Sequence, residues 1–208
     1  TSRYGEVHSD LLKELKMAIA GDLPEGWEDT IPSFTEEDGP LATRAASGAV
    51  LNAVASTIDN LVGGSADLAP SNKTIQTEKS IFGPENGSGH NIHFGVREHA
   101  MAGIANGMAR HGGLIPYVAT FLIFSDYMRP SIRLSALMQT KMIYIFTHDS
   151  VGVGEDGPTH QPVEQTMSLR LIPGLTVLRP ADANETAEAW YTALSSKGPV
   201  VLVLTRQK

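Results

Sequence analysis

Short apolar stretches rich in β-branched residues alternate with helix-like stretches from residue 43 to residue 205. The strands are expected at 58–62, 91–96, 114–119, 142–147, 175–178 and 200–205. The helices are expected at 43–56, 98–110, 124–138, 163–171 and 184–195. This alternation is typical of a parallel sheet that is covered by helices on both faces. The sequence therefore predicts an α/β fold that is doubly wound around a mostly parallel β-sheet.

Residues 1–40 have a different character. Ser9 is expected to cap one helix, whose apolar residues recur at helical spacing until Gly21 ends it. Prolines, glycines and acidic residues follow, which is typical of a surface segment. We therefore expect 1–40 to be an interdomain linker with one helix and 41–208 to be a single domain. The start at Thr1 suggests a processed or excised piece.

Charge and composition exclude several kinds of partner. The net charge of −7 argues against nucleic acid and against an anionic membrane surface. No apolar run reaches the length of a transmembrane helix. The chain has no cysteine, which fits a reducing compartment, so a cytoplasmic location is expected.

Unusual polar and aromatic residues gather at the expected ends of strands. Glu98 stands between the strand 91–96 and a helix rich in small residues, where open α/β sheets build ligand sites. Loop 63–72 is rich in glycine, and its composition is typical of an ordinary polar turn, although Ser71 and Asn72 can also bind an oxyanion. Loop 148–161 carries two histidines and several acids, which suit a sugar-like ligand. Aromatic residues recur every third position from 121 to 127, where a flat heteroaromatic ring would pack.

A metal site is the rival interpretation. The candidate ligands are His90, His93, Glu98 and His99. His90 and His93 would point to opposite faces of an extended strand, so this spacing does not supply convergent ligands. We expect no metal site within this chain.

Taken together, these runs resemble the pyrimidine-binding domain of the transketolase family, which uses thiamine diphosphate. The resemblance covers nearly the whole chain and is carried by the runs 42–44, 63–72, 94–99, 119–127, 147–162, 179–182 and 206–207. It implies transfer of a two-carbon ketol unit from a ketose phosphate to an aldose phosphate, in the pentose phosphate pathway.

The resemblance also implies roles for single residues on the cofactor side. Glu98 corresponds to the acid that shares a proton with a ring nitrogen of the cofactor's aminopyrimidine and so activates it. Phe121, Phe124 and Tyr127 correspond to the pocket of the pyrimidine ring. Asp67 corresponds to a residue near the cofactor and the subunit contact.

On the substrate side, the resemblance makes His160 the histidine that holds the donor sugar near the reacting carbon. His148 would lie beside it, and Asp156 would read a sugar hydroxyl. Arg44, Ser71 and Arg206 resemble the phosphate anchors at the mouth of the substrate channel.

One departure from the family pattern limits what this chain does alone. The family binds the diphosphate and its Mg²⁺ or Ca²⁺ through another domain with a Gly-Asp-Gly run, which this sequence lacks. The implied partner is the diphosphate-binding domain of a second subunit, in a homodimer. We expect the chain to be inactive alone, as a fragment or one chain of a split enzyme.

Two alternatives stay open. One is a relative within the superfamily, either dihydroxyacetone synthase or deoxyxylulose phosphate synthase. The phosphate anchors Arg44 and Ser71, with the paired His148 and His160, favour transketolase over deoxyxylulose phosphate synthase. The other alternative is a non-catalytic interaction module that has kept the fold.

Overall fold

The computed structural model describes residues 2–208, which form one six-stranded sheet in the order β2-β1-β3-β4-β6-β5 with every neighbouring pair parallel. The strands are β1 (Leu61–Ser65), β2 (Asn91–His93), β3 (Ile115–Phe121), β4 (Ile143–Thr147), β5 (Thr176–Leu178) and β6 (Val200–Val203). The α-helices are α1 (Ser2–Val7), α2 (Ser9–Ala20), α3 (Thr43–Ala55), α4 (Ala69–Asn72), α5 (Glu98–His111), α6 (Ser125–Leu137), α7 (Gln165–Arg170) and α8 (Ala183–Ser195). Short 3₁₀ helices are η1 (Trp27–Thr30), η2 (Glu36–Asp38), η3 (Leu122–Phe124) and η4 (Pro158–His160). The predicted doubly wound α/β fold is confirmed.

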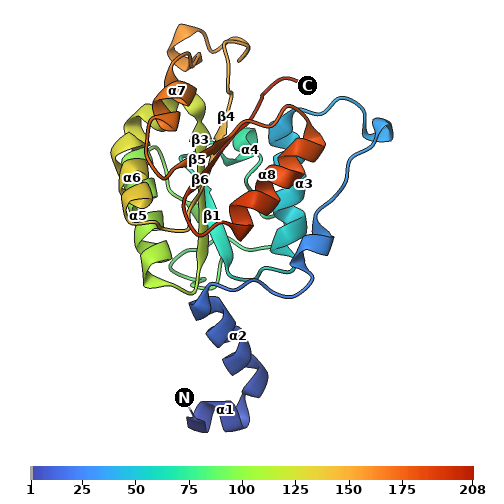
Figure 1. The fold of residues 1–208 in the computed structure, drawn as a ribbon, viewed down its shortest axis with the longest axis vertical. Coiled ribbons are helices and arrows are strands. Elements are labelled where there is room, and N and C mark those ends of the chain that lie inside the picture. The colour runs from blue at the N-terminus through green and yellow to red at the C-terminus, as the bar shows by residue number, and fades with distance from the viewer. Residues whose placement is uncertain (1) are drawn as a thin grey trace.

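Both faces of the sheet are buried, because alternate residues of each central strand enter different cores. In β4, Ile143 and Ile145 pack with α3 and α8, whereas Tyr144 and Phe146 pack with α5, α6 and α7. Figure 1 shows these two helix layers on opposite sides of the strands. Burial on both faces explains why the central strands β1, β3, β4 and β6 contain no charged residue.

The first strand begins three residues later than the sequence predicts. Residues 56–60 form the turn after α3, where the amide of Ile58 donates to the carbonyl oxygen of Val54 in α3 and the amide of Leu61 donates to that of Ile58. The strand therefore includes Gly63 and Gly64, which we expected in a loop. Their backbone lies so close to β2 and β3 that a Cβ atom would overlap the carbonyl oxygens of Ile92 and Tyr117.

The segment 1–40 contains two α-helices where one was expected. Ser9 does not cap α2: it is the first helical residue, and its hydroxyl donates to Asp10. None of the residues of α2 is buried, and α1 and α2 project away from the sheet (Figure 1). None of the described helices is both long and apolar enough to span a bilayer.

The rest of this segment packs on the domain. Trp27 is buried in the core with α3 and α8, and its ring stacks on Tyr191 at 5.5 Å between centroids. The backbone of Phe34 exchanges two hydrogen bonds with the side chain of Asn184. Apolar residues between the prolines therefore attach residues 23–34 to α8.

Candidate functional site

The site lies at the carboxyl edge of the sheet, around the point where the chain changes direction. From β1 the chain crosses to β2 on one side, and it then returns to β3 on the other side of β1. Such switch points open a crevice between the loops that follow the two strands. The loop 148–161 lies at the end of the domain opposite to α1 and α2 (Figure 1).

Glu98 is the first residue of α5 and is 9% exposed. Gly95, whose φ is +70°, turns the chain between β2 and α5, a conformation that favours glycine. The helix dipole favours a negative charge at this position. Within residues 2–208 the carboxylate of Glu98 has no hydrogen-bond or ion-pair partner, so both oxygens are available to a ligand.

Three aromatic rings stack one after another beside Glu98. The rings of Phe121 and Phe124 stack with centroids 6.1 Å apart, and those of Phe124 and Tyr127 are also 6.1 Å apart. Phe121 ends β3, Phe124 ends η3 and Tyr127 lies in the first turn of α6. Spacing by three residues therefore places the rings on one side of a tight turn.

A cavity of about 550 Å³ joins these groups. Its lining includes Glu98, Phe124, Tyr127, His160 and Asp67. Asp67 follows β1 in the left-handed region, with φ +60°. The structure thus brings together the residues that the sequence analysis assigns to the cofactor side, with Phe121 in contact through the ring of Phe124.

Two histidines contact these stacked rings. The ring of His148 stacks on Phe121 at 3.7 Å between centroids, and the ring of His160 stands edge-on to Phe124 at 5.3 Å. His160 ends η4, which is part of the long loop after β4. His148 has φ +58° and is 4% exposed. The loop 148–161 therefore folds back, so that His160 lies near His148.

Arginines from the two ends of the domain meet near His148. Arg44, at the start of α3, donates to the backbone carbonyl of Ser71 at 2.9 Å. Arg206 follows β6 and packs against Gly154, whose φ is +93°. The burial of Arg44 and the nearby charge of Arg206 lower the pKa of Arg44. Two adjacent cations form a place for a phosphate group.

Burial lowers the pKa of His148 to about 4, with further lowering from Arg44 and Arg206 that exceeds the opposing effect of Asp156. Asp156 is exposed in the same loop. The ring of His148 is therefore neutral near pH 7 and acts through hydrogen bonds.

This shift makes the stability of the fold depend on pH. The unfolded chain takes up a proton near pH 6.5, whereas the folded chain does so only near pH 4, so acid favours unfolding. We expect His148 to lower the free energy of unfolding by up to about 3 kcal/mol as the pH falls from 6.5 to 4. Urea unfolding at pH 7.5 and 4.5 measures this, with His148→Asn as the non-titrating comparison. Equal pH slopes for the two proteins would contradict the prediction.

Some polar residues serve the architecture instead of a ligand. Asp149, whose side chain is 2% exposed, forms an ion pair with Arg179 at 2.7 Å, which ties the loop to the end of β5. The sequence places Asn72 in a polar turn or at an oxyanion, but it is fully buried and hydrogen-bonds to Ser65 and Thr147. The sequence analysis missed both arrangements, because each joins residues that are distant in the chain.

The rival metal site does not assemble. The ring nitrogen Nε2 of His90 donates to the carbonyl oxygen of Asp59, and the ring of His99 hydrogen-bonds to Ser131. Among the described residues, no three histidine, aspartate or glutamate side chains lie close enough to hold a metal ion.

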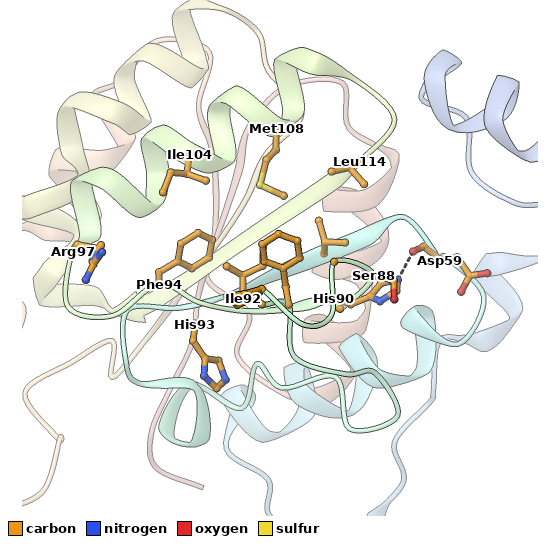
Figure 2. A pocket seen from close by; sticks show the side chains of 16 residues that line it. Asp59, Ser88, His90, Ile92, His93, Phe94, Arg97, Ile104, Met108 and Leu114 are labelled. Atoms are coloured by element: carbon orange, nitrogen blue, oxygen red, sulfur yellow. Dashed lines mark hydrogen bonds between the residues drawn. The ribbon is translucent and has the colours of Figure 1, made fainter.

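A larger pocket of about 940 Å³ lies away from this site, behind the edge strand β2. Figure 2 shows Ile104 and Met108 of α5 facing Phe94 and Ile92 across it. Its lining is mostly apolar and includes neither Glu98 nor the stacked rings. Volume alone therefore does not locate the chemistry.

Fold and site define an α/β ligand-binding domain with its site at the carboxyl edge of a parallel sheet. The site contains an acid, a stack of three rings and a cationic corner, which Arg44 and Arg206 form. A family model described as the transketolase pyrimidine-binding domain matches residues 39–208. The chain belongs to the transketolase family, of which it is this domain.

Individual relatives agree. The chain is 55% identical to the transketolase of Halalkalibacterium halodurans, over 99% of this chain and 31% of that protein. A Pichia stipitis transketolase solved in complex with sedoheptulose-7-phosphate is 42% identical, with a TM-score of 0.95, over 99% of this chain and 32% of that one. A split-gene transketolase described as an inactive β4 tetramer is 28% identical, with a TM-score of 0.65, over 81% of this chain and 53% of that one. The chain thus spans about a third of the length of the full-size relatives.

Proposed function

We propose that this chain supplies the pyrimidine-binding half of a thiamine diphosphate site for ketol transfer between sugar phosphates. The observation that carries the proposal is the carboxylate of Glu98, nearly buried and without a partner, in one cavity with the stacked rings and His160. Carboxylate oxygens that line a cavity and have no partner in the protein are free to accept or share hydrogen bonds with a ligand that enters it.

The residues present fit the aminopyrimidine part of the cofactor. Glu98 would hold a shared proton at a ring nitrogen, and Phe121, Phe124 and Tyr127 offer π-faces to a flat heteroaromatic ring. The apolar wall would strengthen the hydrogen bond of Glu98 once the cofactor and a covering domain exclude water from the cavity. When bound, thiamine diphosphate supplies the carbanion chemistry at its thiazolium carbon, and the protein orients and polarises it.

The residues of this chain do not fit the diphosphate and its divalent ion. No metal-holding cluster exists among residues 2–208, and the two neighbouring arginines lie with His148, not beside Glu98. We propose that Mg²⁺ or Ca²⁺ and the diphosphate are held by another domain.

The cationic corner suits the phosphate of a sugar phosphate. Arg44 and Arg206 would bind it, and Ser71 adds a hydroxyl beside Arg44. His160, close to the rings, would then contact the sugar near the reacting carbon, and Asp156 would read a hydroxyl farther along. The cofactor side and the phosphate side are joined by His148, which touches Phe121 and responds to both arginines.

The site is open on one side, which supports completion by another domain. Val96 and Tyr127 line the cavity but are 76% and 64% exposed. Exposed apolar walls around a cofactor cavity are typical of a domain interface. We propose that the diphosphate-binding domain of a partner subunit covers them, in a homodimer or in a split assembly. The pathway and the cytoplasmic location stay predictions.

Ketol transfer between a ketose phosphate and an aldose phosphate tests the function. Purified chain with thiamine diphosphate and magnesium should show no turnover, because half of the site is missing. Addition of a diphosphate-binding domain from a close relative should produce turnover that depends on this chain. Robust turnover by the chain alone would contradict the half-site proposal, and failure of every combination would favour a non-catalytic module.

A further inference from the structure

A chain of buried side-chain hydrogen bonds crosses the sheet beneath the site. The hydroxyl of Ser65 lies 2.6 Å from Oδ1 of Asn72, and Nδ2 of Asn72 lies 2.7 Å from Oγ1 of Thr147. Oγ1 of Thr147 lies 2.9 Å from Nδ1 of His148. The first three side chains belong to residues that are at most 3% exposed. This series of hydrogen bonds therefore links the ends of β1 and β4 through α4, out of reach of water.

All hydrogen bonds in this series are donated in the same direction, from Ser65 toward His148. The amide of Leu68 donates to Oγ of Ser65, so the serine hydroxyl is free to donate to Oδ1 of Asn72. The NH₂ group of Asn72 then donates to Thr147. If the amide were reversed, the hydroxyl hydrogen of Ser65 would be buried without an acceptor, at a cost of about 1–3 kcal/mol.

The hydroxyl hydrogen of Thr147 has one destination. Within residues 2–208, its oxygen bonds only to Asn72 and to His148. Asn72 is a donor to this oxygen, so Nδ1 of His148 is the remaining acceptor for the buried hydroxyl hydrogen. Nδ1 is then an acceptor, and a neutral ring must carry its hydrogen on Nε2.

We infer that Asn72 is a positioning residue, which acts through Thr147 to hold His148 in the Nε2–H tautomer as a hydrogen-bond donor to an oxygen of the sugar phosphate. The inference rests on the proposed function, because it takes His148 as a substrate contact. The left-handed backbone of His148 and its stacking on Phe121 fix the ring plane, so the tautomer alone decides what the free nitrogen offers.

The second histidine provides an internal contrast. Thr159 hydrogen-bonds to Nδ1 of His160 at 2.8 Å, in the same relation as Thr147 to His148. Thr159 is exposed, and no side chain donates to its hydroxyl among the described residues. Its hydroxyl can therefore donate or accept, and the tautomer of His160 is not set.

NMR of the histidine ring nitrogens in this chain at pH 7 tests the inference. Native His148 should show one tautomer, Nε2–H. Asn72→Asp replaces the donor by a carboxylate that accepts from Thr147, so His148 should change to Nδ1–H. Thr147→Val removes the donor to Nδ1 with little change of volume, so the two tautomers should mix.

Controls separate this effect from damage to the fold. His160 should keep its signals in both variants. Thr159→Val should shift the ring-nitrogen signals of His160 but not those of His148. Near-ultraviolet circular dichroism reports the folded core, and Thr147→Val carries the test if Asn72→Asp does not fold. A mixture in the native chain, or an unchanged His148 in Thr147→Val, would overturn the inference.

Kinetics then distinguish the inference from the proposed function. In the chain assembled with a diphosphate-binding domain, Asn72→Asp should raise KM for a phosphorylated donor about tenfold and change kcat less, because one hydrogen bond is lost. A reversed tautomer with an unchanged KM would overturn the substrate role of His148. If the native assembly has no activity, the proposed function fails, while the NMR result stands by itself.

Discussion

Glu98→Gln should lower the rate of ketol transfer by about 10²–10⁴-fold when the chain is assayed with the domain that completes the cofactor site. The amide keeps the size of the side chain but cannot share an acidic proton with a ring nitrogen. The loss corresponds to about 3–5 kcal/mol of activation free energy. The measurement is kcat at saturating thiamine diphosphate, so that weaker cofactor binding does not contribute.

The position of Glu98 makes a matched control possible. Glu188 is an exposed glutamate on α8, outside the cavity that Glu98 lines. Glu188→Gln makes the same chemical change and should leave kcat within a factor of two or so, as expected for a surface substitution. A Glu98→Gln rate close to the native one would leave the family assignment intact but remove the proton-sharing role.

Gly63→Ala should destabilise the fold by more than about 3 kcal/mol, beyond the usual cost of an added methyl group in a core. The new Cβ atom would overlap the backbone carbonyl oxygen of Tyr117 on the neighbouring strand, which has no rotamer to relieve the contact. The expected result is a lower urea midpoint or no folded protein. β1 pairs with both β2 and β3, so its displacement also moves the loop that carries Asp67.

Gly103→Ala should have the opposite sign. Gly103 lies within α5, and a Cβ atom there would meet no atom within 4 Å. Alanine restricts the unfolded chain and favours the helix, so the free energy of unfolding should rise by about 0.5–1 kcal/mol. If both substitutions destabilise the chain equally, close approach of the strands is not the reason for Gly63.

The sequence predicted the structure correctly where local patterns determine it, and incorrectly where contacts between distant residues determine it. Helix and strand types came from local periodicity, and they were right for the strands of β-branched residues, such as β4 and β6. β1 was displaced because glycine has a low preference for strands, and only the neighbouring backbone explains its presence there. Likewise, nothing local distinguishes Trp27 in an apparent linker from an exposed residue.

The site was predictable where short spacing carries it. The rings at 121, 124 and 127 recur every third residue, and Glu98 stands at a strand–helix junction. Asn72 was not predictable as a buried residue, because its partners lie 7 and 75 positions away in sequence. A polar residue directly after Ser71 looks like a surface turn until the sheet brings β4 against it.

The strand order also has a consequence for synthesis of the chain. β6 is the last of these six strands to be made, yet it lies between β4 and β5, and β5 pairs with no other strand among residues 2–208. Thr43 hydrogen-bonds to Thr205 across 162 positions, next to the two arginines. A nascent chain therefore lacks one strand within its sheet, with unpaired strand edges that favour mispairing, until residue 203 has left the ribosome.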